Sequence, residues 1–185
     1  ADGDEKLNLD VSVKPDNEKG GGSNYPQEQS YKRDWETTVK DGLLSIDGQL
    51  KDIQMQFCSH TKVLTEGGKT EDNKDKVTVK DAKTVTIITS IGTDYKNDYP
   101  TYRDKNKDLK KVVADRVNNG TKKSYDELKE THIADHQGLF DRVSLDLGEQ
   151  RTSVPTNQLV DEYRNGNYSH YLEVLAFQYG RYLTI

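Results

Sequence analysis

Residues 84–91 read Thr-Val-Thr-Ile-Ile-Thr-Ser-Ile, an unbroken run of mostly β-branched side chains. Such side chains favour extended backbone, and a continuous run of them is typical of a central strand. Other stretches upstream also have strand patterns, clearest where apolar and polar residues alternate with a period of two. These stretches cover residues 7–13, 42–48, 53–63 and 76–80. The first half of the chain therefore predicts about five strands.

Turn signals separate these strands. Pro15 ends the first one, Gly67 and Gly68 supply a turn, and residues 81–83 form a short connection between the last two. Strands spaced in this way predict an antiparallel, sandwich-type sheet. Five strands are few for a closed sandwich, and Ala1 stands close before the first of them. We therefore expect earlier strands of this domain to be absent from the chain.

A long polar loop is predicted after Pro15, with residues 20–26 at its centre. Loops of this length are uncommon within compact domains. It is expected either to be flexible or to reach a neighbouring part of the protein. Trp35 lies in the same polar stretch, and its role is left open.

The second half of the chain changes to the three- and four-residue spacing of helices. Asp108 is a suitable N-cap for the first helix, and Ser124 with Glu127 forms a capping box for the second. Gly138 is a candidate interruption of that second helix. The predicted helices cover residues 108–118, a segment from 124 onward, a short segment from 155, and 169–183. The fold class is therefore α+β, a partial antiparallel β-sandwich followed by helices.

The last predicted helix, residues 169–183, is rich in apolar side chains and ends without a capping signal. A helix of this kind needs packing partners. Because no later sequence supplies them, we expect the chain to be part of a larger protein.

Composition narrows the class of protein. Hydrophobic residues make up 31% of the chain and charged residues 32%, a balance that is also found in disordered proteins. The apolar residues are patterned, however, which argues against disorder. The net charge is −5, with acidic and basic residues well mixed and no basic stripe. This charge distribution argues against nucleic acid as a partner.

The single cysteine, Cys58, excludes an internal disulfide, and its place within a predicted strand favours a packed thiol over a reactive one. The first residues have neither the basic nor the apolar region of a signal peptide. No run approaches the roughly 18 apolar residues of a membrane span. The chain is expected to have no membrane span.

Two histidines, His132 and His136, lie four residues apart on one predicted helix and would share a face. Zinc proteases carry a glutamate between such histidines. Here Ile133, Ala134 and Asp135 stand between them. A helix surface on which both rings hydrogen-bond to neighbours is the favoured interpretation.

Three of the pairs of adjacent carboxylates in the sequence raise the hypothesis of glycosidase chemistry, which uses two carboxylates across a sugar. The pairs are Glu71 with Asp72, Asp126 with Glu127, and Asp161 with Glu162. Their mixture with lysines favours a solvated surface. Three tyrosines after the last strand, Tyr95, Tyr99 and Tyr102, are suited to stacking on sugar rings, although packing against the adjoining helices is favoured.

No nucleophile motif, phosphate loop or dinucleotide fingerprint is present. We therefore expect no catalytic, cofactor-binding or metal-binding residue in this chain, and no cofactor.

From about Phe57 to the C-terminus, several blocks in a fixed order resemble glycoside hydrolase family 95, the α-L-fucosidase family. The first 50 or so residues match that family only in their strand pattern. The blocks are residues 77–95, resembling the last strands of its β-domain; Ser124 to Leu128, His132 to Asp135 and Leu139 to Gly148, resembling its linker; and Pro155–Thr156 with Leu175 to Leu183, resembling the entry to its catalytic barrel.

The resemblance implies a bacterial protein with an N-terminal β-sandwich, a helical linker, an (α/α)6 catalytic barrel and a C-terminal β-domain. It implies hydrolysis of terminal α-L-fucosyl linkages, typically α-1,2, with inversion, by a general-acid glutamate and a water assisted by asparagine and aspartate. Those positions are expected beyond Ile185, so no catalytic residue is carried over to this chain.

The same resemblance divides the chain into three parts: residues 1–103 as the end of the β-sandwich domain, 104–153 as linker and 154–185 as the start of the barrel. The expected partners are a fucosylated glycan, bound through the missing catalytic domain, and the rest of the polypeptide. Secretion or a cell-surface location is expected. The alternatives are a stand-alone carbohydrate-binding or interaction module, and a relative that acts on another sugar such as an α-L-galactoside.

Overall fold

A computed structural model describes residues 2–15 and 33–185. The chain divides into two compact units, Ala1–Tyr125 and Asp126–Ile185. The predicted loop at residues 20–26 lies outside the described residues. The predicted divisions after residues 103 and 153 stay predictions.

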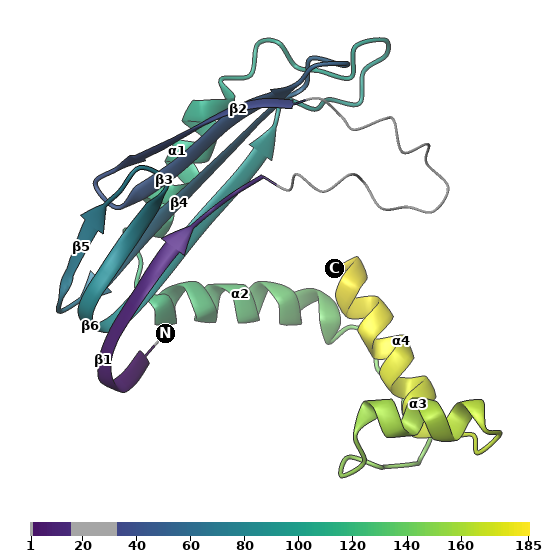
Figure 1. The fold of residues 1–185 in the computed structure, drawn as a ribbon. Helices are drawn as coiled ribbons and strands as arrows, with labels where there is room; N and C mark the ends of the chain where they lie inside the picture. Colours follow the sequence, from purple (N-terminus) through teal and green to yellow (C-terminus); the bar gives the residue numbers. More distant parts are fainter. Residues whose placement is uncertain (1, 16–32) are drawn as a thin grey trace. The chain divides into compact units, whose positions relative to one another are not determined.

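The first unit contains one six-stranded antiparallel sheet (Figure 1). Five strands follow the order β1-β6-β4-β3-β2, and the short β5 pairs with β6. The α+β class and the antiparallel order are confirmed. The second layer of a sandwich stays a prediction. The strands are β1 (Asp2–Ser12), β2 (Arg33–Lys40), β3 (Leu43–Leu50), β4 (Gln56–Glu66), β5 (Lys69–Asp72) and β6 (Lys76–Thr93).

Strand β2 corrects the placement of Trp35 in a polar loop. The strand pairs with β3 along its whole length, with Trp35 opposite Gly48. Two residues, Asp41 and Gly42, connect them with φ of 54° and 70°, which is the backbone of the two-residue turn that favours Asp-Gly. β2 has no buried residue, so its sequence lacks the apolar alternation that would reveal a strand.

Strand β6 corrects a second prediction. Residues 76–80 and 84–91 were expected to be separate strands, but one strand runs through both. Its first part pairs with β1 and β5, and its second part pairs with β4. Asp81 has a φ of 55°, a value that aspartate tolerates better than most residues, and its N–H donates to Asn8 at 3.1 Å. The predicted connection is therefore an irregular point within a strand.

A third correction concerns the predicted strand at 53–63. β4 begins at Gln56, and Ile53 and Met55 precede it in the turn that follows β3. Ile53 is exposed. Its apolar side chain was therefore wrongly taken as the first inward-facing residue of the predicted strand.

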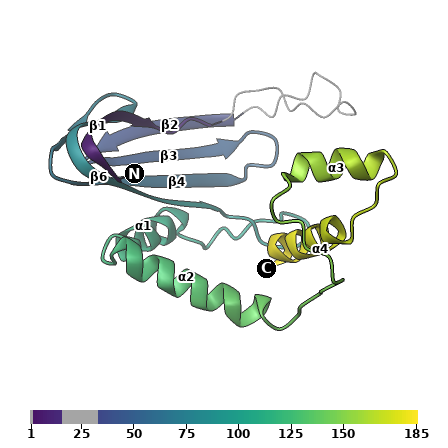
Figure 2. The ribbon, with the colours of Figure 1, turned by 90° about the horizontal axis from the view of Figure 1, so that it is seen from below.

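The two faces of the sheet carry different clusters. One face holds the main core, which joins buried side chains from β1, β3, β4 and β6: Val11, Leu44, Val63, Val77, Val79, Ala82 and Val85. Helix α1 (Leu109–Gly120) lies against the other face (Figure 2). There Leu109 and Val113 pack with Cys58. Asp108 caps α1 as predicted, since its side chain accepts from the N–H of Lys111 at 3.0 Å.

The second unit is helical, with α2 (Tyr125–Phe140), α3 (Thr156–Arg164) and α4 (His170–Thr184). The predicted helices are confirmed, and α2 continues through Gly138 without interruption. Ser169 caps α4 by accepting from the N–H of Leu172 at 3.3 Å. Neither α2 nor α4 contains a buried residue. The assignment of α4 to a barrel stays a prediction.

Candidate functional site

The histidine pair on α2 belongs to an aromatic cluster. His136 stacks on Phe140 with ring centroids 5.2 Å apart and lies 5.5 Å from Tyr182 of α4. The guanidinium of Arg181 lies 4.3 Å above the Phe140 ring. His132 lies 6.2 Å from His136. Within residues 33–185 and 2–15, neither histidine belongs to a group of three side chains that could hold a metal ion.

The carboxylates of Glu71 and Asp72 have structural partners. Glu71 lies 3.0 Å from the ammonium of Lys69 and 2.7 Å from that of Lys80, and these hydrogen bonds hold its pKa below the ordinary value. Asp72 accepts from the N–H of Gly42 at 2.9 Å. This contact joins the turn between β2 and β3 to the last residue of β5.

The pair on α3 is also engaged. Glu162 lies 2.7 Å from the guanidinium of Arg151, and this contact lowers its pKa. Asp161 lies 3.6 Å from Arg164. Glu149 accepts from the N–H of Tyr171 at 3.2 Å, at the start of α4. These contacts tie the segment after α2 to α3 and α4. The third pair, Asp126 with Glu127, lies in the first turn of α2.

The three tyrosines lie on the segment that joins β6 to α1, and all of them are exposed. Tyr99 is 81% exposed, and its ring meets Tyr102 edge to face with centroids 6.2 Å apart. None of the three is buried by α1. Their part in sugar stacking or in packing stays a prediction.

Asp94 anchors this segment, and no sequence pattern drew attention to it. Its buried carboxylate accepts from the N–H of Gln56 at 2.9 Å and pairs with Arg103 at 2.7 Å. The only hint in the sequence that Asp94 has a structural role was its position directly after the last predicted strand. Its partners became apparent only when the loop and β4 were brought together.

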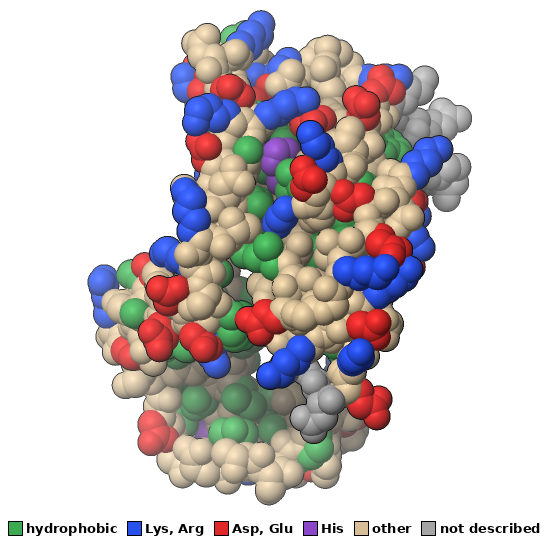
Figure 3. Space-filling model, turned by 90° about the vertical axis from the view of Figure 1, so that its left-hand side faces the viewer, with side chains coloured by type: hydrophobic (Ala, Val, Ile, Leu, Met, Phe, Trp, Pro, Cys, Tyr) green, Lys and Arg blue, Asp and Glu red, His purple; other side chains and the backbone are tan. Residues whose placement is uncertain are grey.

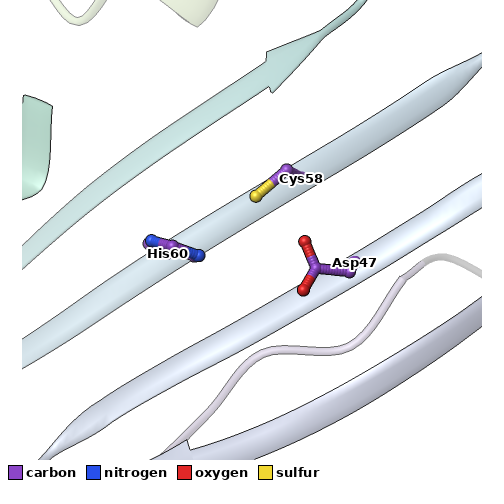
Figure 4. Close-up of side chains that lie close together, drawn as sticks. All are labelled: Asp47, Cys58 and His60. Carbon is purple, nitrogen blue, oxygen red and sulfur yellow. The ribbon is translucent and has the colours of Figure 1, made fainter. Parts of the chain in front are cut away.

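A second group that sequence analysis missed lies on β3 and β4, on the face covered by α1. Asp47 pairs across the strands with Cys58, and His60 is two residues further along β4 (Figure 4). The ligand atoms of these three side chains all lie within 4.8 Å of one another. The only available signal was the Cys-x-His spacing, which places both side chains on one face of a strand.

Partial burial shifts the pKa values of side chains in this group. Burial, with a smaller contribution from Asp47, raises the pKa of the Cys58 thiol to about 12. Burial also lowers the pKa of His60. Lys110 of α1 lies 2.9 Å from Asp47 Oδ2. Asp47 Oδ1 and His60 Nδ1 are buried and have no hydrogen-bond partner among the described residues.

A pocket of about 340 Å³ adjoins this group and is lined by Asp47, Lys110, Trp35, Phe57 and neighbouring residues of β2, β3 and β4. On the face drawn in Figure 3, acidic and basic side chains lie side by side without a large patch of one sign. No helix among the described residues is long and apolar enough to cross a membrane.

Two family models match the chain in succession. Residues 1–98 match the glycosyl hydrolase family 65 N-terminal domain, and residues 124–185 match the glycosyl hydrolase family 95 catalytic domain. The first match includes the 50 or so residues whose resemblance rested on strand pattern alone. The change from one family model to the other falls close to the division between the two compact units.

Curated relatives agree with this pattern. The chain is 40% identical over 75 residues to the probable alpha-fucosidase A of Aspergillus niger, covering 40% of this chain. It is 29% identical over 139 residues, or 71% of this chain, to alpha-L-fucosidase 2 of Arabidopsis thaliana. It is 30% identical over 118 residues, or 59% of this chain, to the probable alpha-fucosidase A of Aspergillus oryzae. The chain spans between 9% and 16% of the length of these relatives.

Proposed function

We propose that this chain is the β-domain and linker portion of an α-L-fucosidase. It carries a glycosyl hydrolase family 65 N-terminal domain over residues 1–98, and residues 124–185 match the glycosyl hydrolase family 95 catalytic domain. The complete enzyme removes terminal α-L-fucosyl residues, typically α-1,2-linked, with inversion. The observation that carries this proposal is the succession of the two family models along one chain, together with the alpha-fucosidase relatives.

This portion is non-catalytic in the proposal. The carboxylates of Glu71, Asp72 and Glu162 have partners that hold the fold. The chain covers at most 16% of the relatives it matches, so most of the enzyme lies outside residues 1–185. We assign the reaction to that remainder.

The proposal assigns three residue ranges of the chain to three parts of the enzyme. Residues 1–103 end the β-domain, 104–153 form the linker and 154–185 begin the catalytic barrel. The exposed apolar side chains of α4, such as Phe177 and Leu183, support the barrel assignment, because a helix of this kind becomes stable by burying that surface. Secretion or a cell-surface location in a bacterium is part of the same proposal; the relatives named above come from fungi and a plant.

The test uses the complete enzyme and 2′-fucosyllactose. Inversion at an α-linked fucoside releases β-L-fucose first, and proton NMR distinguishes it from the α-anomer before mutarotation. We expect β-L-fucose as the initial product. Initial α-L-fucose would contradict an inverting enzyme. Faster hydrolysis of a matched α-L-galactoside would favour the relative that acts on that sugar.

A second function is favoured by one observation, the edge-to-face pair of exposed Tyr99 and Tyr102. Exposed aromatic faces on a fixed loop suit sugar stacking. A carbohydrate-binding module predicts calorimetric binding of fucosylated oligosaccharides by this chain alone, with loss of binding in Tyr99→Ala. Tyr125→Phe, which lies outside the loop, is the control.

A further inference from the structure

The group formed by Asp47, Cys58 and His60 contains three kinds of metal ligand. Carboxylate oxygen, thiolate sulfur and imidazole nitrogen are the donors that proteins use for zinc. Thiolate and imidazole favour first-row transition metals, whereas calcium and magnesium prefer sites made of oxygen alone. The donor set therefore selects a divalent transition metal of the zinc type.

The strands hold the three donors in place. Cys58 and His60 are two residues apart on β4, so their side chains leave the same face. The register places Asp47 of β3 directly opposite Cys58. Around one tetrahedral zinc ion the donor atoms lie roughly 3.3–3.8 Å apart. Since all three lie within 4.8 Å of one another, shifts of about 1 Å by side-chain rotation bring them to this distance.

Two buried polar atoms of this group without a hydrogen-bond partner also point to a bound ion. Asp47 Oδ1 and His60 Nδ1 are shielded from solvent and have no hydrogen-bond partner in the described part of the chain. Buried polar atoms are nearly always paired, because loss of hydration costs free energy. A cation held between Oδ1 and Nδ1 would satisfy both atoms at once. Cys58, which is 1% exposed, closes the inner side of the site.

Lys110 is the competing cation. Its ammonium pairs with Asp47 Oδ2 at 2.9 Å and leaves Oδ1 unpartnered. The adjoining pocket of about 340 Å³ is lined by Asp47 and Lys110, so water beside Asp47 is available as the fourth ligand.

We propose that Asp47, Cys58 and His60 bind one divalent transition-metal ion of the zinc type, with water as the fourth ligand. On binding, the S–H bond of Cys58 breaks, a sulfur–metal bond forms and the proton is released to solvent. No redox step is involved. The ion joins β3 to β4 on the face of the sheet that α1 covers.

The test begins with cobalt as a spectroscopic substitute for zinc. The purified chain, freed of metal under reducing conditions, is titrated with Co²⁺. We expect a near-ultraviolet thiolate-to-cobalt charge-transfer band, intense visible bands of a four-coordinate ion, and saturation at one ion per chain. Excess Zn²⁺ should abolish these bands. Absence of the charge-transfer band would overturn the proposal without the need for any variant.

Variants then place the ion. In Cys58→Ser, which keeps the size of the side chain, the charge-transfer band should vanish and the dissociation constant for Zn²⁺ should rise at least about tenfold, since loss of even an outer partner costs that much. His60→Ala should weaken binding similarly. Lys110→Met removes the competing cation and should bind Zn²⁺ at least as tightly. The control is the double variant His132→Ala/His136→Ala, which should bind Zn²⁺ unchanged.

Three further outcomes would contradict the site. Unchanged zinc affinity in Cys58→Ser would place the ion elsewhere, and loss of affinity in the His132→Ala/His136→Ala control would place it on α2. If no variant and no wild-type sample binds zinc, the three side chains form a metal-free polar contact with Lys110. None of these results bears on the proposed fucosidase function.

Discussion

The carboxylate of Asp94 and the guanidinium of Arg103 form a nearly dry ion pair, with Oδ2 2.7 Å from Nη2 and 2.8 Å from Nε. The side chains are 2% and 15% exposed. The other carboxylate oxygen of Asp94 accepts from the N–H of Gln56. The pair thereby fixes the segment after β6 to the start of β4, on the path that leads to α1.

Arg103→Met should therefore destabilise the chain strongly. Removing one partner leaves the Asp94 charge buried without compensation, which typically costs about 3–5 kcal/mol. Urea denaturation followed by tryptophan fluorescence measures this change. Lys51→Met is the control, because it removes a pair with Asp34 whose side chains are half or more exposed and should cost less than about 1 kcal/mol. Equal losses in both variants would contradict the structural role of the buried pair.

Gly92 of β6 tests the contact between the sheet and α1. A Cβ atom at this position would lie 3.0 Å from Leu109 Cδ1 and 3.2 Å from Val113 Cγ2. Gly92→Ala should overpack this contact and lower the free energy of unfolding by about 1–3 kcal/mol. Gly138→Ala on α2 meets nothing within 4 Å and should raise it by about 0.5–1 kcal/mol. Thermal denaturation measures both changes. A more stable Gly92→Ala variant together with a less stable Gly138→Ala variant would contradict the prediction.

Glu149 predicts a pH effect on the second unit. The N–H of Tyr171 and other donors at the start of α4 hold the pKa of its carboxyl below the ordinary value of 4.5. Since the folded pKa is the lower one, the stabilisation is present above the unfolded value and is lost as pH falls through the folded value. A carbon-13 NMR titration should show Glu149 titrating below 4.5. Titration at its ordinary value would contradict this contact, and Glu149→Gln should remove the part of the pH dependence that Glu149 contributes.

The helices were predictable from the sequence because their signals are local. Asp108 and Ser169 cap α1 and α4 through contacts within three residues. Strand β2 was missed because it has no buried residue and its Trp35 looks isolated in a polar stretch. Strand β6 was predicted as two strands separated near Asp81, because a residue with positive φ inside a strand has no recognisable apolar pattern.

The candidate site depended on contacts that are distant in sequence. Cys58 and His60 are neighbours on one face of β4, and their spacing alone indicates as much. Asp47 joins them only through the register of β3 against β4, and Lys110 only through the packing of α1. A one-residue slip of that register would send Asp47 to the opposite face. The same limit applied to Asp94 and Arg103.

The proposal that this chain is the non-catalytic portion of an α-L-fucosidase is tested most directly by assaying the 185-residue chain itself on 2′-fucosyllactose. Released fucose is measured against a buffer control. We predict no release above that control. Turnover at the rate of about 1–1,000 per second that is typical of enzymes would contradict the proposal.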